Sequence, residues 1–371
     1  MPEPSHVDAT VRWRPSLGGV RGLAVLCVVG FHAGIPVQSG GVAGVTLFFV
    51  LSGYLIATLL MREREATGTI DVPRFFARRA WRLLPALVAV MIALAMLRFA
   101  AGDAHELAED SLLTLAYLAN WARSAGDQMG WWNHAWSLSV EGQFYVLAPL
   151  TILLLARARR PSSRRLVVAL VVAIGGVMLW RAALVEGGAS SARIYFGTDT
   201  RADALLLGCL LAAIRMRHPG WSPTPLLGPI ALMSFGLLAV LPLVDVFGPS
   251  SGYGSIALAS IGVVAGALGD DRCSRGLTAR PLVWLGERSY SLYLVHVPVF
   301  MYLNQLLATL APAARVGTQV VVALALSALL FRYVERPLRH GLTRRGRVVE
   351  GVSRRRDEAG SALRLGPELP A

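Results

Sequence analysis

The chain has 371 residues, of which 54% are hydrophobic and only 16% are charged, and its mean hydropathy is +0.54. A soluble domain usually carries about a quarter of charged residues, so this composition excludes a disordered, a collagen-like and an ordinary water-soluble protein. All 36 basic residues are arginines, and the net charge is +13. Because the arginines lie between long apolar runs, they favour a membrane with anionic headgroups over a nucleic acid as the partner.

Ten stretches are long and apolar enough to cross a hydrocarbon core about 30 Å thick, which takes roughly 20 helical residues. They are residues 17–36, 44–61, 83–101, 138–156, 165–184, 201–215, 225–246, 253–269, 289–311 and 317–334, of which the sixth is short. The first is not expected to be a cleaved signal peptide, because arginines precede it and another span follows almost at once.

The connection 102–137 is long and rich in aromatic residues, which predicts a lid or a substrate platform. Within it, residues 107–121 form an eleventh apolar stretch that is short and contains Glu109 and Asp110. We predict that this stretch is an interfacial or re-entrant helix.

The distribution of arginines predicts the orientation of the spans. If both termini are cytoplasmic, thirty of the 36 arginines lie on the inner side and six on the outer side. In membrane proteins the cytoplasmic segments carry such an excess of basic residues. With an odd number of spans, arginine-rich segments would fall on both sides and the excess would disappear. We therefore predict an all-α polytopic integral membrane protein, with a cytoplasmic segment 1–16, a membrane domain 17–340 and a basic, disordered cytoplasmic tail 341–371.

The cysteines and short motifs indicate no metal site. Cys27 and Cys209 lie in apolar stretches and Cys273 in an arginine-rich loop, without the spacing of a disulfide framework or of metal ligands. No CxxC, HExxH, Walker-type loop or GxGxxG after a strand occurs.

His32 is the first ionisable residue inside a predicted span, where such residues mark function by default. It follows Arg21 by eleven residues, which is a rise of about 16.5 Å and brings the helix back to within about 20° of the same face. Arg21 at the inner surface and His32 toward the outer leaflet are therefore predicted on one stripe of one helix. The alternative is a histidine that is merely hydrogen-bonded within the bundle.

Glu141 is the second such residue, at a depth from the outer surface like that of His32. Ser137, Glu141 and Tyr145 are spaced i, i+4, i+8 and share a helix face. A carboxylate beside an imidazole can hold one tautomer and stabilise the imidazolium, so contact between Glu141 and His32 is expected from their shared depth alone. The alternative is a buried glutamate that fixes helix packing through tyrosine or serine.

Two further stretches have a helical pattern. In RFFARRAWRLLP, Arg78 and Arg82 share a face with Arg79 one step round, and arginine forks bind phosphate, although simple anchoring at the inner surface explains them as well. In GVTLFFVLSGYLI, Ser52 lies on a face of small residues that allow close approach of another helix or of a ligand. Asp203 beside Arg201 could form an ion pair on the outer side.

Together these stretches resemble the membrane acyltransferase-3 family of acyl-CoA-dependent O-acyltransferases, over about residues 17–340. The resemblance rests on seven motifs in the family's order: VRGLAVLCVVGFH, GVTLFFVLSGYLI, RFFARRAWRLLP, WSLSVEGQFYVLAP, TRADALLLGCLLA, GERSYSLYLVHVP and RYVERPLR. It implies a multi-pass protein of the bacterial cytoplasmic membrane, in the form without the hydrolase-like domain that many relatives carry after the last span. Relatives often have Asp at the place of Gly18 and a second Glu at the place of Gly142.

The resemblance implies that His32 is the general base with Glu141 as its partner, and that acyl-CoA, acetyl-CoA in the first instance, is a co-substrate with no permanently bound cofactor. The residues that would bind acyl-CoA are Arg21, Ser52, Arg78, Arg79 and Arg82. Trp136, Ser137, Tyr145 and His296 would line the acceptor site or pack helices. The acyl group would pass directly to an acceptor hydroxyl or through an intermediate on His32 or Ser52.

Three classes of function compete at this point. The first is O-acylation of a carbohydrate or glycosylated acceptor, with cell-envelope polysaccharide, peptidoglycan, a lipid-linked sugar and a glycosylated metabolite all open. The second is a proton-coupled transporter or exporter in which His32 and Glu141 relay protons. The third, a structural or sensory membrane module, leaves the register of Arg21 and His32 unexplained.

Overall fold

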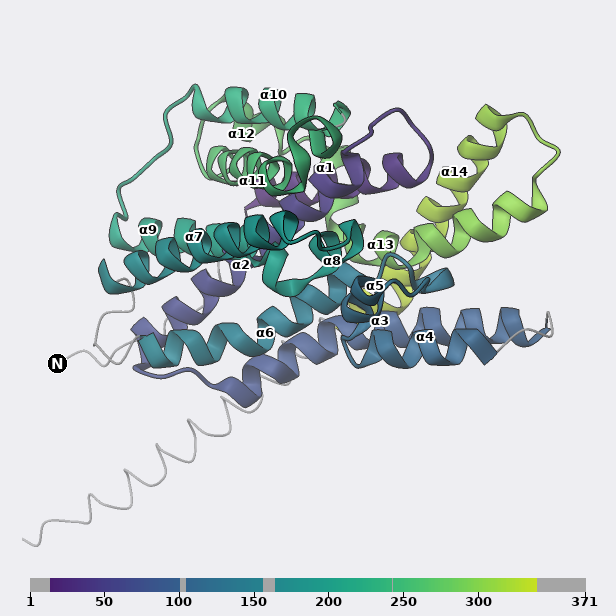
Figure 1. Ribbon diagram of the computed structural model, residues 1–371, viewed down its shortest axis with the longest axis horizontal. Coiled ribbons are helices and arrows are strands. Elements are labelled where there is room, and N and C mark those ends of the chain that lie inside the picture. The colour runs from purple at the N-terminus through teal and green to yellow at the C-terminus, as the bar shows by residue number, and fades with distance from the viewer. Residues whose placement is uncertain (1–13, 101–104, 156–163, 242, 339–371) are drawn as a thin grey trace, which may run out of the picture.

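The computed structural model describes residues 14–100, 105–155, 164–241 and 243–338, and the described chain is helical throughout, without strands (Figure 1). The predicted tail 341–371 and most of the predicted segment 1–16 lie outside these ranges. The long helices are α1 (Pro15–His32), α2 (Gly40–Thr67), α3 (Val72–Ala100), α6 (Trp136–Leu155), α7 (Arg164–Glu186), α9 (Thr198–Arg217), α10 (Leu227–Val240), α11 (Leu243–Gly266), α13 (Arg280–Leu306) and α14 (Pro312–Leu330). The short ones are α4 (His105–Leu115), α5 (Ala119–Ala125), η1 (Gly130–Trp132), α8 (Ser191–Phe196), α12 (Arg272–Gly276) and the π-helix η2 (Phe331–Glu335).

Each of the ten predicted stretches falls mainly on one of the ten long helices. By length and composition, five helices of the described chain can cross a membrane: α1, α2, α3, α7 and α14. The helical, multi-pass class is thus confirmed, whereas ten crossings and cytoplasmic termini stay predictions. Helix α9 is not among the five, and its first turns contain Asp199, Arg201 and Asp203.

The seventh predicted span, 225–246, extends too far, because α10 ends at Val240. The eighth, 253–269, coincides with the apolar part of α11, although the helix as a whole already begins at Leu243. Gly248, with a φ of 72°, interrupts the helical conformation inside α11, and the apolar part of this helix is Gly252–Gly266. A glycine adopts this left-handed backbone conformation without the steric cost that a Cβ would bring.

The eleventh apolar stretch forms two helices instead of one. Helix α4 ends at Leu115 and α5 begins at Ala119, and between them Tyr117 has a φ of 56°. The following 3₁₀ turn η1 buries Trp132, whose indole nitrogen donates to Ser111 Oγ at 2.9 Å. The described part of this segment, which was expected to be a lid or a substrate platform, packs on α3, α6, α8 and α13.

Close contacts between backbones hold the centre of the bundle together. A Cβ on Gly53 of α2 would lie 2.0 Å from the carbonyl oxygen of Leu205 on α9, and a Cβ on Gly208 would lie 2.0 Å from that of Val50. A Cβ on Gly286 of α13 would lie 1.8 Å from the carbonyl oxygen of Gly18 on α1. Small residues are what permits such close approach of helices in membranes. Helix α1 thereby packs between α2 and α13, and α2 between α1 and α9.

Two arginines are buried where α7 and α9 meet. Arg181 donates to Asp203 at 2.8 Å, so Asp203 pairs with Arg181 and not with the adjacent Arg201 as the sequence had suggested. Arg201 donates instead to Thr46 Oγ1 at 2.7 Å and lies over the ring of Tyr253, 4.3 Å from its centroid. On a helix, residues two apart point to different sides, which sends Arg201 toward α2 and Asp203 toward α7.

Candidate functional site

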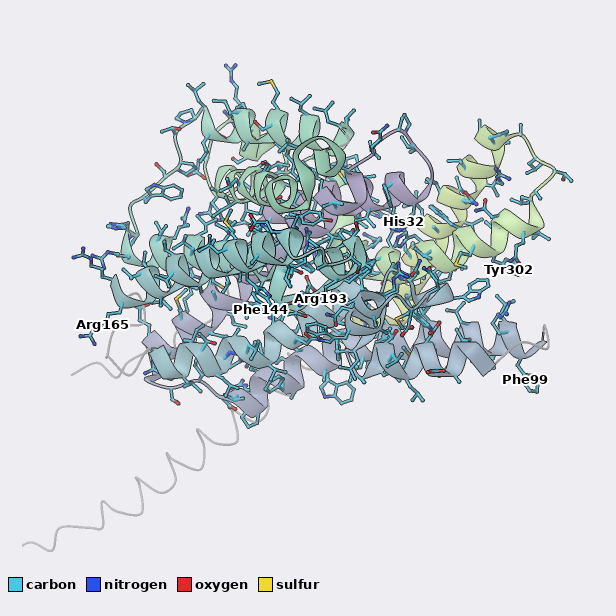
Figure 2. The ribbon with its side chains drawn as sticks, in the orientation of Figure 1. His32, Phe99, Phe144, Arg165, Arg193 and Tyr302 are labelled. Atoms are coloured by element: carbon cyan, nitrogen blue, oxygen red, sulfur yellow. The ribbon has the colours of Figure 1, made fainter. Side chains whose placement is uncertain are left out.

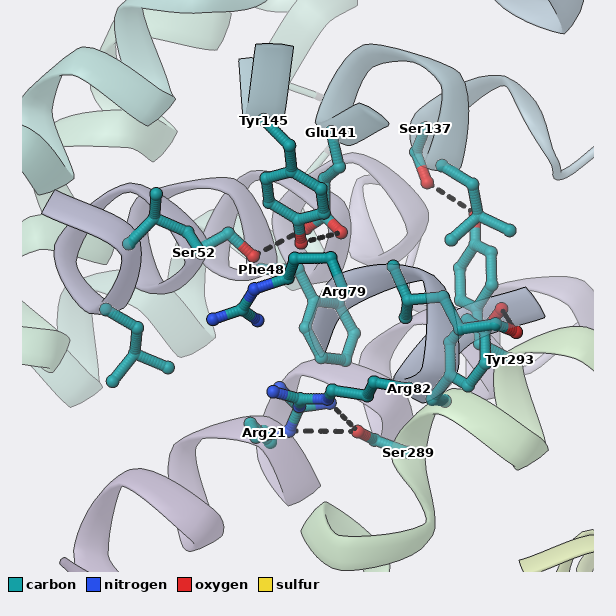
Figure 3. Close-up of a pocket in the computed structure, with 15 residues that line it drawn as sticks. Arg21, Phe48, Ser52, Arg79, Arg82, Ser137, Glu141, Tyr145, Ser289 and Tyr293 are labelled. Atoms are coloured by element: carbon teal, nitrogen blue, oxygen red, sulfur yellow. Dashed lines mark hydrogen bonds between the residues drawn. The ribbon is translucent and has the colours of Figure 1, made fainter. Parts of the chain in front are cut away.

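A pocket opens between five helices (Figure 3). Figure 2 shows the described side chains in the orientation of Figure 1, with His32 labelled. The walls of the pocket come from α1, α2, α3, α6 and α13. The lining residues are Arg21, Phe48, Ser52, Leu55, Ile56, Arg79, Arg82, Leu83, Ser137, Leu138, Glu141, Tyr145, Ser289, Tyr290 and Tyr293. Segments that are far apart in sequence therefore contribute to one polar site, and it contains three arginines but a single carboxylate.

Glu141 accepts two hydrogen bonds in this pocket. The hydroxyl of Ser52 donates to one carboxylate oxygen at 2.7 Å, and the hydroxyl of Tyr145 donates to the other at 3.2 Å (Figure 3). Ser137, one turn earlier on α6, lines the same pocket. The predicted shared face of Ser137, Glu141 and Tyr145 is therefore confirmed, and it faces α2.

Arg21 is fixed against α13. Its guanidinium donates to Ser289 Oγ at 2.9 and 3.2 Å and to the carbonyl oxygen of Gly286 at 3.2 Å. It also lies over the ring of Phe48, 5.9 Å from the centroid. Ser289 and Gly286 of α13 therefore anchor the guanidinium of Arg21 at the wall of the pocket.

The arginine cluster divides between the pocket and the protein surface. Arg79 and Arg82 line the pocket, and Arg79 stacks over Tyr145 at 5.7 Å. Arg78 makes an ion pair with Glu63 of α2 at 3.3 Å and lies outside the pocket. Residues three and four apart are both neighbours on a helix, so spacing alone does not decide whether Arg78 or Arg79 accompanies Arg82. The structure places Arg79 in the pocket, whereas the ion pair with Glu63 holds Arg78 outside it.

His32 lies at the end of α1 beside a second histidine of α13. Its Nδ1 is 2.9 Å from the carbonyl oxygen of Val28 and 3.4 Å from Nε2 of His296. Nδ1 of His296 is in turn 2.8 Å from the carbonyl oxygen of Tyr293. A carbonyl oxygen only accepts, so in the neutral state both Nδ1 atoms carry the proton and both Nε2 atoms have a free lone pair.

The hydrogen bond between the two imidazoles therefore has one direction, with His32 as the donor and His296 as the acceptor. Nε2 of His296 faces the Nδ1–H of His32, and Nε2 of His32 is left as an unprotonated nitrogen on an exposed side chain. Arg21 and His32 both contact α13, through Ser289 and His296, which confirms that they share one stripe of α1.

A third histidine, His134, completes the cluster around α13. It is buried, its ring centroid lies 5.2 Å from that of His296, and it stacks on Trp132 at 6.2 Å. Tyr293 joins this cluster to the pocket: its ring packs on both buried histidines and its hydroxyl donates to the carbonyl oxygen of His134 at 2.6 Å. That hydroxyl has one hydrogen, so it accepts the hydrogen bond of Ser137 at 2.8 Å.

The expected contact between His32 and Glu141 was wrong. The hydrogen-bond partners of Glu141 are Ser52 and Tyr145, and the side-chain partner of His32 is His296. Depth in a membrane fixes only the height of a residue along the bundle. Helix α1 packs on α2 and α13 whereas α6 packs on α2, so the two residues reach different neighbours.

Trp136 is a packing residue in this arrangement. It is buried against Phe49 of α2 and against Tyr195 and Phe196 of α8, and it does not line the pocket. Ser289, which anchors Arg21, was not among the predicted site residues. The available signal was its place in the SYSLYL motif, one residue before Tyr290. Among the described residues, no group of three or more His, Cys, Asp and Glu side chains is arranged to hold a metal ion.

The chain is therefore a multi-pass helical membrane protein. It has an arginine-lined pocket, and near it His32 and His296 are in hydrogen-bonding contact. Residues 14–332 match the model of a family described as an acyltransferase domain, the acyltransferase-3 family, and the chain belongs to it.

Named relatives share about 30% of the aligned residues. The chain is 30% identical to O-acetyltransferase OatA of Staphylococcus aureus (strain NCTC 8325 / PS 47), over 88% of this chain and 57% of that protein. It is also 30% identical to peptidoglycan O-acetyltransferase OatA of Listeria monocytogenes (88% and 56%), and 31% identical to putative peptidoglycan O-acetyltransferase YrhL of Bacillus subtilis (90% and 56%). The chain thus spans little more than half the length of these relatives. No solved structure matches it.

Proposed function

We propose that this chain is a membrane O-acetyltransferase that moves an acetyl group from cytosolic acyl-CoA to a hydroxyl of a cell-envelope carbohydrate. The observation that carries the proposal is an arginine-lined pocket whose lining residue Tyr293 packs on His296, which in turn contacts His32 with its open Nε2. His32 and His296 do not line the pocket themselves, so the proposal requires these side chains to move aside for the donor. The names of two relatives, a peptidoglycan O-acetyltransferase and a putative peptidoglycan O-acetyltransferase, point to a peptidoglycan sugar as the acceptor.

The pocket would hold the donor through its positive charge. Arg21, Arg79 and Arg82 surround one carboxylate, so an anionic ligand is favoured there. Guanidinium groups match phosphate with paired hydrogen bonds, and acyl-CoA carries several phosphates on a long, thin arm. The arm would extend from these arginines toward His32, which keeps the charged nucleotide at the inner surface and brings only the thioester into the membrane.

His32 would then act as the general base. Its Nε2 takes the proton of the acceptor hydroxyl while that oxygen attacks the thioester carbonyl carbon. The carbon–sulfur bond breaks, and the CoA thiolate leaves and recovers the proton from His32. His296 accepts the Nδ1–H of His32 and so holds the tautomer in which Nε2 is free.

A specific hydrogen bond supports a second route to the same product. Ser52 donates to Glu141 at 2.7 Å, an arrangement in which the carboxylate could draw the proton from Ser52 as the serine attacks the thioester. The acetyl group would then rest on Ser52 before transfer. Trapping of an acetylated Ser52 after mixing with labelled acetyl-CoA, in the absence of acceptor, decides between the two routes.

The central test measures free CoA released from acetyl-CoA by the purified protein with cell-envelope extract as acceptor. We expect His32→Ala to lower turnover by about 10²–10⁴-fold, the usual contribution of a proton-taking side chain. His218→Ala, at the exposed end of α9, is the matched control and should keep full turnover. Equal turnover of His32→Ala and wild type would refute the base assignment. No CoA release from folded protein, with any acyl-CoA or acceptor, would favour a proton-coupled transporter.

A further inference from the structure

A second pocket lies on another face of α2 and shares no lining residue with the first. Its walls come from the start of α1, the second half of α2, the end of α9 and the chain around α12. Helix α2 presents Ser52 and Ile56 to the first pocket but Tyr54, Thr58 and Arg62 to the second. Successive positions turn by about 100°, so these two sets point in different directions from one helix.

The second pocket is basic. Arg14, Arg62, Arg215 and Arg275 line it, and each comes from a different segment of the fold. Two carboxylates, Glu65 and Asp270, also line it.

In the described structure neither carboxylate makes an ion pair with any of the four arginines. The pocket therefore keeps an excess of positive charge that its own acidic residues do not neutralise.

Two buried polar atoms in this pocket have no hydrogen-bond partner. Thr58 is only 3% exposed, and its Oγ1 bonds to nothing in the described structure. One terminal nitrogen of Arg215 is likewise buried without a partner, while its guanidinium lies 5.8 Å from the ring centroid of Trp221. Buried donors nearly always have a hydrogen-bond partner, and a donor without one destabilises the folded protein, most of all when the group is charged.

We propose that this second pocket binds a phosphate group, carried by an anionic phospholipid or by a soluble nucleotide, independently of the donor pocket. A phosphate supplies the acceptor oxygens that the Thr58 hydroxyl and the Arg215 guanidinium lack, and the negative charge that four arginines favour. The pocket lies at the end of the bundle where the described chain begins, which the arginine distribution predicts to be the inner surface. Anionic headgroups and soluble phosphates are both present on that side of a membrane.

Bound phosphate would tie four segments of the fold together. Arg14 precedes α1, Arg62 belongs to α2, Arg215 ends α9 and Arg275 belongs to α12, so one ligand would bridge elements that lie far apart in the sequence. A ligand that binds only the folded state raises the unfolding temperature as its concentration rises. Occupation of this pocket is therefore measurable without any acyl transfer.

The test uses delipidated full-length protein in detergent and follows its unfolding temperature and its binding isotherm. The probes are phosphatidylglycerol, phosphatidylcholine, inorganic phosphate and adenosine 3′,5′-bisphosphate. We expect Arg215→Gln to weaken binding of the active probe by roughly tenfold or more, since a charge-assisted hydrogen bond contributes about 1.5–3 kcal/mol. Thr58→Val, which keeps the shape of the side chain, should weaken it as well.

The matched control is Arg217→Gln, because Arg217 lies two residues from Arg215 on α9, is exposed and does not line the pocket. It should bind like the wild type. Phosphatidylglycerol binding that depends on Arg215 supports the proposal with a lipid source, and bisphosphate binding that depends on Arg215 supports it with a nucleotide source.

The proposal is overturned if no probe binds the wild-type protein. It is also overturned if every probe binds folded Arg215→Gln and Thr58→Val as tightly as the wild type. Nucleotide binding that is lost in Arg79→Gln but kept in Arg215→Gln belongs to the donor pocket and counts against the second site.

Discussion

At the scale of single residues, backbone carbonyl oxygens, which can only accept hydrogen bonds, determine which ring nitrogen of His32 carries the proton. The carbonyl oxygens of Val28 and Tyr293 fix the Nδ1–H tautomer of His32 and of His296. His296 therefore takes the orienting position that the sequence had given to Glu141. Glu141 lies instead in the arginine-lined pocket, where it accepts hydrogen bonds from Ser52 and Tyr145.

This arrangement predicts a role for His296 that substitution can isolate. His296→Leu removes the side-chain acceptor for the Nδ1–H of His32 and leaves the carbonyl oxygen of Val28 as its one described acceptor. We expect kcat to fall by about 10–100-fold, the value of a hydrogen bond to a charged group, with little change in KM. His296→Gln retains an acceptor oxygen and should restore part of the activity. A merely structural histidine would show equal losses in both variants and a lower unfolding temperature. The measurement is steady-state CoA release.

Arg79 lines the pocket and the adjacent Arg78 does not, so we expect substitutions at these two positions to affect the KM for acetyl-CoA differently. Arg79→Lys loses the fork that can bind phosphate in the pocket, so KM for acetyl-CoA should rise by about tenfold. Arg78→Lys, beside Glu63 and outside the pocket, should keep the KM of the wild type. Equal KM values for the two variants would contradict the assignment of Arg79 to the donor. Initial rates at varied acetyl-CoA concentration give both constants.

At the scale of elements, glycines determine how closely the central helices approach. Gly53 and Gly208 let α2 and α9 touch through their backbones, and Gly286 does the same for α13 and α1. Of these helices, α1, α2 and α13 also form walls of the arginine-lined pocket, so the contact between α1 and α13 at Gly286 also limits its width.

Alanine substitution tests this packing directly. Gly53→Ala places a carbon 2.0 Å from a carbonyl oxygen of α9, so the helices must move apart, and we expect a destabilisation of about 1–3 kcal/mol. Gly175→Ala in α7 meets nothing within 4 Å and should leave stability unchanged or raised by about 0.5–1 kcal/mol. Thermal unfolding in detergent measures both, and a Gly53→Ala protein as stable as Gly175→Ala would contradict the close packing.

At the scale of the whole molecule, the number of membrane crossings remains the main prediction. Glu186 ends α7 and Arg217 ends α9, and both are exposed. If α9 crosses the membrane, these positions lie on opposite sides. If only the five long apolar helices cross, they lie on the same side.

Cysteine labelling distinguishes the two topologies. In a variant with Cys27, Cys209 and Cys273 replaced by alanine, we expect Glu186→Cys to react with a membrane-impermeant maleimide in intact cells. Arg217→Cys should react only after the membrane is opened, because the arginine distribution places it inside. Reaction of both positions in intact cells would contradict the ten-span topology.

The sequence by itself determined where the long helices lie along the chain and which side chains share a face of one helix. Hydropathy located the ten long helices, and helical periodicity placed Ser137, Glu141 and Tyr145 on one face and Arg21 and His32 on one stripe. Both are properties of local spacing, because side-chain direction along a helix repeats at a fixed angle.

Only the tertiary structure decided which helices face one another. It joined Glu141 to Ser52, His32 to His296 and Asp203 to Arg181. The sequence had suggested His32 as the partner of Glu141, with a serine or tyrosine as the alternative, and Arg201 as the partner of Asp203, so for Glu141 the alternative is the one confirmed. Spacing fixes the height and direction of a side chain on its own helix. The neighbour that it meets depends on lateral packing, which here follows from backbone contacts at a few glycines spread over the whole chain.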